Sequence, residues 1–331
     1  MENILKCHEI VKTDFVSGEN CYLYDQNGHQ YIDFESGIWS AALGHSHPRI
    51  NQVIKTQAEK LVHLGTRYPS LVSEKAARDV LDIIGIEQGK CTFLSSGSEA
   101  VEFAVQAARL ITKKKQLLTF SNSYLSAYGS AGKKNTAEWI LLDWRAWEQE
   151  KDTDKFLNKL AFDTMGAFVL EPGGSGSGFV KFHPKPLVQA LVKKVKQFGG
   201  LLVVNEITTG MGRTGKWFGF NHYDLQPDIV ALGKGLGNGY PISAVAMNSY
   251  CAQALENREL RYAQSHQNDP LGCSVAREVI AIMREENWVE RGAELGVYFL
   301  DGLRRLKEKY DLVKDVRGRG MLLALEFHPH E

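Results

Sequence analysis

Lys234 is the residue of this 331-residue chain whose surroundings most clearly suggest chemistry. It lies between Gly233 and Gly235, just after the apolar run 229–232, which predicts a buried strand. Lysine is rarely buried, because removing its ammonium group from water is costly. A lysine at the end of a buried strand therefore suggests a neutral amine that forms a Schiff base with a carbonyl group. Its position alone is explained more simply by a loop lysine that follows a strand.

A second strand end strengthens the chemical interpretation. The apolar run 201–204 ends at Asn205 and Glu206, and a glycine-rich stretch follows up to Gly215. Two strand ends that carry functional groups, each followed by glycines, predict an open α/β sheet with its site at the carboxyl edge. We therefore expect Asn205 and Lys234 to lie at the same edge.

The segment Ser96-Gly97-Ser98-Glu99 opens a predicted helix directly after a predicted strand. The free backbone N–H groups and a hydroxyl at such a helix start can hold a phosphate. Ser96 and Glu99 are also spaced as a capping box, which needs no ligand. Without Lys234 the capping interpretation would be preferred.

Residues 199–247 resemble the signature of class III (ω-type) aminotransferases, pyridoxal phosphate enzymes of fold type I. In that family an apolar strand leads to Asp-Glu, a variable pair and Thr-Gly-x-Gly-Arg-Thr-Gly, and the lysine follows in a glycine-rich segment before a proline, here Pro241. The resemblance implies that Lys234 holds pyridoxal 5'-phosphate as a Schiff base. It further implies transfer of an amino group between an amine or amino acid and a keto or aldehyde acceptor. Asn205 stands where the family has aspartate.

The resemblance extends to the other residues that would surround the cofactor. Gly97 and Ser98 match the family's phosphate-binding Ser-Gly-Thr-Glu-Ala, and Ser265 lies where a neighbouring subunit of a homodimer supplies a second phosphate hydroxyl. Tyr124, followed by leucine and serine where the family has His-Gly, would stack on the pyridine ring. The remaining expected residues are Glu171 of the Glu-Pro pair and Thr208 beside the cofactor, and Trp39 as a wall of the substrate pocket, for which a buried structural role is about equally suitable.

Asn205 leaves the mechanism open. An aspartate keeps the pyridine nitrogen protonated, whereas a neutral asparagine donates its N–H and favours the unprotonated ring, a weaker electron sink. Three interpretations follow: an aminotransferase that is slowed or specialised, a racemase or lyase on the same fold, and a catalytically weak regulatory relative that binds the cofactor. Retention of Lys234 favours an enzyme.

The alternating strand and helix patterns predict an α/β fold, with a mostly parallel sheet covered by helices on both faces. Residues 20–36 predict a hairpin around Asn27-Gly28. By resemblance, residues 45–262 form the large cofactor-binding domain, and residues 1–44 and 263–331 form a small α+β domain. Family members continue for several dozen residues beyond the point where this chain ends, with an arginine that binds a substrate carboxylate, so the C-terminal part is shortened relative to the family and the presence of a carboxylate on the substrate is open.

Composition argues against several other classes. The formal net charge is zero, which gives no electrostatic case for nucleic acid, and no apolar stretch predicts a membrane span or a leader. The five cysteines form no C-x-x-C pair and the ten histidines show no metal-ligand spacing, so we expect reduced thiols, no native metal site and a cytoplasmic protein. Residues 210–215 fit a dinucleotide G-x-G-x-x-G pattern, but no helix is predicted to start there.

Overall fold

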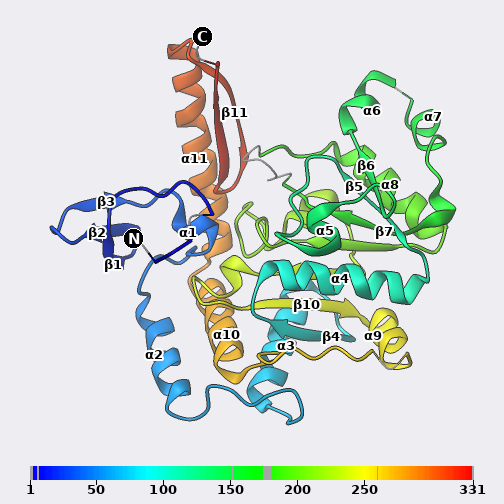
Figure 1. Ribbon diagram of the computed structural model, residues 1–331. Coiled ribbons are helices and arrows are strands. Elements are labelled where there is room, and N and C mark those ends of the chain that lie inside the picture. The colour runs from blue at the N-terminus through cyan, green and yellow to red at the C-terminus, as the bar shows by residue number, and fades with distance from the viewer. Residues whose placement is uncertain (1–2, 6, 151, 174–179, 259, 330–331) are drawn as a thin grey trace.

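A seven-stranded sheet forms the centre of the computed structural model, which describes residues 3–5, 7–150, 152–173, 180–258 and 260–329 (Figure 1). The strand order is β4-β10-β9-β8-β7-β5-β6. Its strands are β4 (Gly89–Leu94), β5 (Gln116–Phe120), β6 (Trp139–Leu142), β7 (Met165–Leu170), β8 (Leu201–Asn205), β9 (Ile229–Leu232) and β10 (Ser243–Asn248). Only β10 runs antiparallel to its neighbours β4 and β9 among these strands, so the predicted mostly parallel sheet is confirmed.

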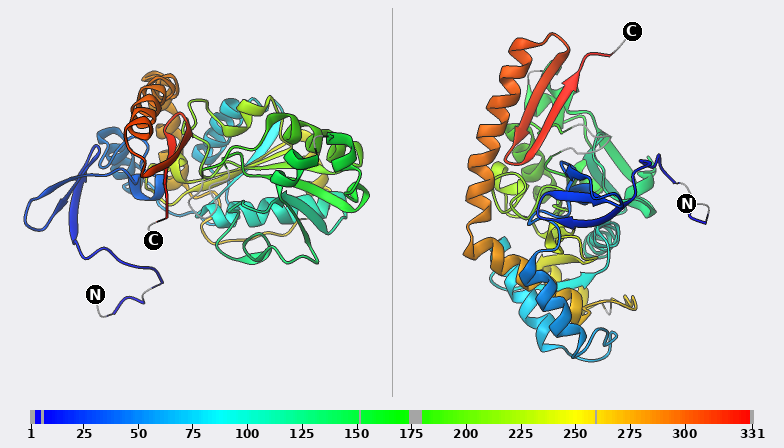
Figure 2. Two further views of the ribbon diagram at one scale, coloured as in Figure 1. Left: turned by 90° about the horizontal axis from the view of Figure 1, so that it is seen from above. Right: turned by 90° about the vertical axis from the view of Figure 1, so that its left-hand side faces the viewer.

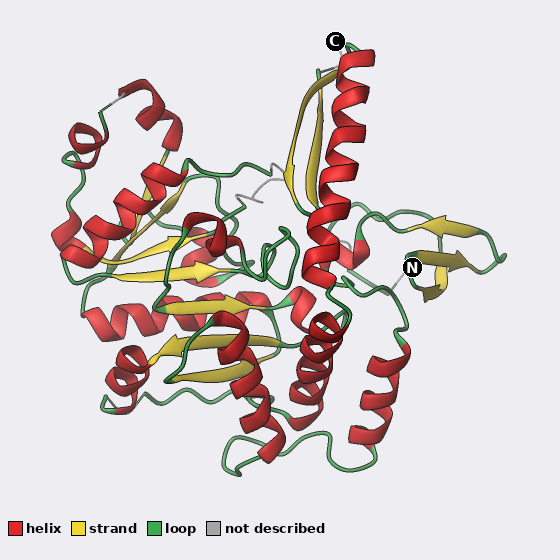
Figure 3. Ribbon diagram, turned by 180° about the vertical axis from the view of Figure 1, so that it is seen from behind, coloured by secondary structure: helices red, strands yellow, loops and turns green. Residues whose placement is uncertain are grey.

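Helices cover both faces of this sheet (Figure 3). One face packs against α4 (Gly97–Thr112) and α9 (Ser249–Glu256), and the other against α3 (Leu71–Ile84), α8 (Lys185–Gln197) and α10 (Pro270–Glu285). Strand β8 shows why the core has two layers: Leu201 and Val203 pack on the side of α4, whereas Leu202 and Val204 pack on the side of α8. Consecutive side chains of a strand point to opposite faces, so a strand covered on both sides must be apolar throughout.

The N-terminal part of the chain forms a separate antiparallel sheet of β1 (Phe15–Glu19), β2 (Tyr22–Asp25) and β3 (Gln30–Ile32). The predicted hairpin at Asn27-Gly28 is confirmed. Asp25 closes its turn by accepting hydrogen bonds from the backbone N–H groups of Asn27 and His29 on Oδ1, both at 2.9 Å, and Gly28 has a positive φ of 81°. This sheet extends away from the central sheet (Figure 2).

The C-terminal part consists of the long helix α11 (Trp288–Lys309) and the antiparallel pair β11 (Val313–Arg319) and β12 (Leu322–Phe327), which lies along that helix (Figures 1 and 2). The rings of Phe34 and Phe299 are in contact, with centroids 6.3 Å apart, and link the chain after β3 to α11. No helix in the described part of the chain is both long and apolar enough to span a bilayer.

Most predicted elements occur within a few residues of their expected positions. The apolar residues from Pro48 to Leu64 recur at helical spacing and predict one helix. The helix α2 (Pro48–Ala58) ends earlier, and the chain turns after it, where the Gln57 side chain donates to the Leu61 carbonyl at 2.8 Å. The sequence did not predict β1, α3, β10 or α9. Shorter elements complete the chain: α1 (Ser36–Trp39), α2 (Pro48–Ala58), α5 (Gly129–Lys133), α6 (Trp144–Glu150), α7 (Thr153–Leu157), η1 (Phe162–Thr164), η3 (Gly219–Tyr223) and η4 (Lys234–Leu236).

Candidate active site

The two strand ends singled out in the sequence lie side by side. Strands β8 and β9 are parallel neighbours with Asn205 paired to Ala231, and the Glu206 N–H donates to the Ala231 carbonyl at 2.9 Å. Lys234 follows three residues after Ala231, at the start of η4, with a positive φ of 44°. A left-handed backbone is uncommon for lysine, and such conformations gather at functional sites. The sheet therefore brings Asn205 and Lys234 to one edge.

Lys234 is half-buried. Its Nζ donates to Thr208 Oγ1 at 2.9 Å and lies 4.8 Å from the centroid of the Trp39 ring. Burial lowers the pKa of Lys234 to about 8; the negative charge of Glu171 opposes this shift and the positive charge of Arg213 adds to it. About a tenth of the amine is then neutral at pH 7, compared with well under a thousandth for an ordinary lysine. A neutral amine is the nucleophile that Schiff-base chemistry requires.

Trp39 is presented by a strained piece of backbone. All four residues of α1 have positive φ values between 53° and 63°, so this single turn is left-handed. Each residue other than glycine in that conformation costs roughly 1–2 kcal/mol. The turn is closed by a hydrogen bond from the Ser40 N–H to the Ser36 carbonyl at 2.8 Å, and Arg213 Nη2 donates to the Trp39 carbonyl at 3.1 Å. Arg213 thus connects this turn to the loop after β8.

Glu171 and Asn205 together hold the backbone of Tyr124. Glu171 Oε2 accepts from the Tyr124 N–H at 2.8 Å, and Asn205 Nδ2 donates to the Tyr124 carbonyl at 3.1 Å. Asn205 Oδ1 accepts from the Ile207 N–H at 3.1 Å, so the two backbone partners require this orientation of the amide. The Tyr124 ring itself is 51% exposed. Its proposed stacking on a pyridine ring stays a prediction.

The start of α4 contains the full capping box. Ser96 Oγ accepts from the Glu99 N–H at 3.3 Å, and Glu99 Oε2 accepts from the Ser96 N–H at 2.7 Å. Capping accounts for these two side chains but leaves the N–H groups of the first helical residues, Gly97 and Ser98, without intrahelical acceptors. The Ser98 hydroxyl accepts from the Ala127 N–H at 2.9 Å. The helix start keeps its capacity to bind an anion.

Glycines let the helix start approach the strand end that leads to Lys234. A Cβ atom added to Gly233 would lie 3.4 Å from the Cα of Gly97, and one added to Gly97 would lie 2.8 Å from Ile207 Cγ2. Gly97 therefore has no room for a side chain. The Ile207 side chain lies beside both Gly97 and Gly233. It therefore connects the start of α4 to the strand ends that lead to Asn205 and Lys234.

Ser265 lies apart from this arrangement. It is exposed in the turn that precedes α10, while its neighbour Gln264 donates through Nε2 to Ser95 Oγ at 3.2 Å. The expected contribution of its hydroxyl to a neighbouring subunit stays a prediction.

The sequence did not single out three charged residues near the site. Arg213 belongs to the quoted Thr-Gly-x-Gly-Arg-Thr-Gly run, which could have directed attention to it. Burial raises the pKa of Glu206 to about 7, although Thr209 and the backbone of Gly219 and Phe220 donate to its carboxyl. Lys134 donates to the Ser123 carbonyl, and burial lowers its pKa while Glu171 opposes the shift. No sequence motif indicates Lys134.

Comparison with known proteins identifies the family. The model of the family "Aminotransferase class-III" matches residues 6–129 and 142–331. The chain belongs to the class III aminotransferases. It is 31% identical to an uncharacterized aminotransferase of Schizosaccharomyces pombe, over 94% of this chain and 75% of that protein. It is also 31% identical to the acetylornithine aminotransferase of Methanopyrus kandleri, over 94% and 80%.

Solved structures agree with the family. The ornithine aminotransferase of Toxoplasma gondii superimposes with a TM-score of 0.87 at 27% identity, covering 99% of this chain and 80% of that one. The fold type predicted from the sequence is confirmed, as is a pyridoxal phosphate enzyme that transfers amino groups. These findings favour transamination over the racemase or lyase alternative.

The residues present fit pyridoxal phosphate. A half-buried amine of lowered pKa at Lys234 suits the cofactor's aldehyde, and the free N–H groups of Gly97 and Ser98 suit its phosphate. Because neither Gly97 nor Gly233 has a side chain, the helix start that would hold the phosphate lies close to the strand end that leads to Lys234.

Proposed function

We propose that this class III aminotransferase works through Lys234, with Asn205 as an uncharged partner of the cofactor's ring nitrogen. Amino groups pass between an amino acid or amine and a keto or aldehyde acceptor, in keeping with relatives named acetylornithine aminotransferase. The observation that carries the proposal is the half-buried Lys234 amine between Thr208 and Trp39, at the edge that also ends in Asn205.

When bound, pyridoxal phosphate supplies an aldehyde that receives the amino group and a ring that withdraws electrons. Lys234 would hold this aldehyde, and Thr208 orients the Lys234 amine through their contact of 2.9 Å. A free Lys234 amine would be suited to move a proton at the substrate Cα, because its pKa of about 8 lies close to neutral pH. Gly97 and Ser98 would hold the phosphate, and Trp39 would form a wall beside the amine.

Asn205 sets how strongly the ring withdraws electrons. One hydrogen of its Nδ2 is used by the Tyr124 carbonyl, and in the described part of the chain the second is left for another acceptor. An unprotonated ring nitrogen is such an acceptor, and the neutral amide provides no charge to keep a proton there. Loss of a charged partner at the reacting system costs several kcal/mol of barrier, or roughly a hundredfold to a ten-thousandfold in rate.

The resemblance also supports a cytoplasmic homodimer in which Ser265 of one subunit reaches the phosphate site of the other. Ser265 is exposed and lies apart from the site of its own subunit, which supports that arrangement. The division into a large domain of residues 45–262 and a small domain from both termini forms part of the same proposal. Arg213 and Glu171 are positioning residues in it, since they set the charge around Lys234 and hold the backbone of Trp39 and Tyr124.

Covalent trapping tests the role of Lys234. The protein is incubated with pyridoxal phosphate, treated with borohydride and digested, and peptide mass spectrometry should find the cofactor on Lys234. Lys134, a second half-buried lysine in the same region, serves as the internal control. An adduct that maps elsewhere, or none at all, contradicts the proposal.

A second assay separates an enzyme from a relative that only binds the cofactor, one of the alternatives that Asn205 leaves open. Candidate amines and amino acids are added, and conversion to the pyridoxamine form is followed by absorbance. Conversion by at least one donor supports the enzyme. Trapping at Lys234 without conversion by any donor supports the binding relative.

A further inference from the structure

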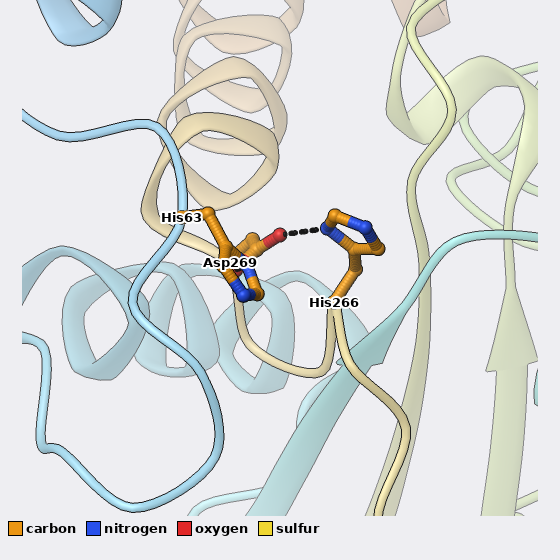
Figure 4. Close-up of side chains that lie close together, drawn as sticks. All are labelled: His63, His266 and Asp269. Atoms are coloured by element: carbon orange, nitrogen blue, oxygen red, sulfur yellow. Dashed lines mark hydrogen bonds and ion pairs between the residues drawn. The ribbon is translucent and has the colours of Figure 1, made fainter.

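Two histidines and an aspartate converge on the surface beside α10 (Figure 4). His63 comes from the loop between α2 and α3, whereas His266 and Asp269 belong to the turn before α10. His63 Nδ1 lies 2.7 Å from Asp269 Oδ1, and His266 Nδ1 lies 2.6 Å from Asp269 Oδ2. One atom from each side chain can be chosen so that all three lie within 4.8 Å of one another.

The aspartate is turned toward the histidines at the expense of its own helix. Asp269 is the N-cap residue of α10, a position at which an aspartate side chain usually accepts from the first turn. Here it makes no capping hydrogen bond, and its two oxygens face the two imidazoles. The orientation is therefore determined by the cluster.

The backbone beneath the cluster is firmly held. Asn268 Oδ1 accepts from the Phe93 N–H at 2.8 Å, and the Asn268 N–H donates to the Phe93 carbonyl at 3.0 Å. Ser73 Oγ donates to the Asn268 carbonyl at 2.7 Å. Gln57, near the end of α2, bonds Ser274 in α10 at 3.2 Å, which connects the helix before His63 to the helix after Asp269. Ligands on a fixed backbone lose little freedom when an ion binds.

We propose that His63, His266 and Asp269 bind a divalent transition-metal ion, with zinc as the best match. Two imidazoles and one carboxylate are ligands that zinc prefers, and three protein ligands with a remaining position for water are typical of an open zinc site. Zinc lies about 2.0–2.1 Å from such atoms, which places tetrahedral ligands about 3.3 Å apart. The two nitrogen–oxygen contacts of 2.7 and 2.6 Å would thus lengthen by less than 1 Å, and the remaining separation among the three ligand atoms, at most 4.8 Å, would shorten by up to about 1.5 Å.

In the cluster the Nδ1 atom of each ring faces a carboxylate oxygen of Asp269. When Nδ1 takes the metal, the ring carries its proton on Nε2 instead, by exchange with solvent. His63 and His266 are exposed in the single chain, and in the proposed homodimer the cluster lies beside the subunit interface, because His266 follows Ser265 in the sequence.

Among the residues that the structure describes, the other histidine–aspartate contacts lack the second imidazole. His29 pairs with Asp25 at 3.0 Å and His45 with Asp33 at 2.7 Å, each with one ring on one carboxylate. Such contacts are ordinary hydrogen bonds. The shared carboxylate at Asp269 distinguishes the cluster from them and makes His29 a suitable control.

Titration calorimetry tests the proposal. The full-length protein with its cofactor is freed of metal by a chelator and of excess cofactor by dialysis, and is then titrated with zinc chloride. We expect one zinc ion per chain for the wild type and for the control His29→Gln. In His63→Gln, His266→Gln and Asp269→Asn the affinity should fall at least tenfold. Circular dichroism confirms that each variant is folded; the substitutions lie on the surface and leave the Asn268 bonds in place.

Cobalt(II) provides an independent readout, since a site of this kind gives visible absorption bands at wavelengths beyond those of the cofactor. These bands should appear in the wild type and in His29→Gln and be absent in His266→Gln. The proposal is overturned if the wild type binds no zinc at about 100 μM, or if His266→Gln binds zinc as tightly as the wild type does. Neither measurement uses an amine substrate or Lys234, so the outcome is independent of the proposed function.

Discussion

Replacing Asn205 by aspartate is the sharpest test of the proposed site. Asn205 is only 4% exposed, and it bonds the backbone at both ends of its amide: its oxygen accepts from Ile207, and one hydrogen of its nitrogen is donated to Tyr124. Aspartate keeps the first hydrogen bond. Its second oxygen would lie about where Nδ2 is now, 3.1 Å from the Tyr124 carbonyl oxygen, so two acceptors would face each other.

The expected loss of stability depends on the cofactor. Without it, one hydrogen bond is lost and a buried acceptor is unsatisfied, which costs about 1–3 kcal/mol. With the cofactor bound, the new carboxylate can accept from a protonated ring nitrogen, and a charge-assisted hydrogen bond contributes roughly 1.5–3 kcal/mol. The cofactor should therefore raise the melting temperature of Asn205→Asp by a few degrees more than it raises that of the wild type.

Asn238→Asp is a matched control. Asn238 Oδ1 accepts from the Leu43 N–H at 2.8 Å, and its Nδ2 donates to the Gly44 carbonyl at 2.9 Å, the same two kinds of bond that Asn205 makes. The control should lose similar stability with and without the cofactor. Melting temperatures of the three proteins, each with and without pyridoxal phosphate, give the comparison.

The rate provides the second measurement. The half-reaction with an active amine donor is followed by stopped-flow absorbance, and Asn205→Asp should exceed the wild type by about a hundredfold or more. The reasoning is refuted if Asn205→Asp loses equal stability with and without the cofactor and gains no rate. Loss of the wild-type activity in this variant would show that the uncharged partner serves a different chemistry.

Three further outcomes follow from the site. Burial lowers the pKa of Lys234 from 10.5 to about 8, so below pH 8 the folded state carries the full cost of the buried ammonium group. The cofactor-free protein should therefore become more stable as the pH rises from about 8 to 10.5. Urea unfolding at each pH should show this rise in the wild type and not in Lys234→Met. Glu171→Gln removes the negative charge that raises the pKa of Lys234, so the reaction of the amine with pyridoxal phosphate should persist to lower pH than in the wild type, as measured by the absorbance of the bound cofactor at each pH. Gly97→Ala places a Cβ atom 2.8 Å from Ile207 Cγ2, so it should lower the stability by about 1–3 kcal/mol and weaken cofactor binding. Adding Ile207→Ala removes the clash and should restore part of the stability and part of the affinity, as measured by thermal melts and cofactor titrations.

The central sheet was predictable because its strands are buried on both faces. Runs such as 201–204 and 229–232 are apolar at every position, and this pattern identifies a covered strand without any partner being known. Strand direction is a different matter. Residues 244–247 of β10 are buried like those of β9, yet β10 runs antiparallel to it, because direction depends on the loop geometry between them and not on the side chains of a short strand.

The site was predictable where it follows the strand ends and not where it depends on distant contacts. Asn205 and Lys234 could be placed together because parallel neighbours end at one edge. The left-handed turn before Ser40 was not predictable, since only one of its four residues is glycine and its conformation is held by the surrounding structure. The contacts of Tyr124 join residues 47 and 81 positions apart, and no local pattern specifies them.

Two departures from the family pattern meet in the structure. Asn205 replaces the aspartate of the strand end, and leucine and serine replace the His-Gly that follows the tyrosine of the loop, here Tyr124. The Asn205 amide donates to the Tyr124 carbonyl, a contact that an ionised aspartate cannot make. The loop as it is folded here therefore requires a donor at position 205 even before any cofactor binds. Asparagine holds the loop, and in the proposed function it would also meet the ring nitrogen without charge. The melting temperatures of Asn205→Asp separate the two roles. The drop in melting temperature without the cofactor reports the lost hydrogen bond to the Tyr124 loop. The part of that drop that the cofactor restores reports the contact with the ring nitrogen.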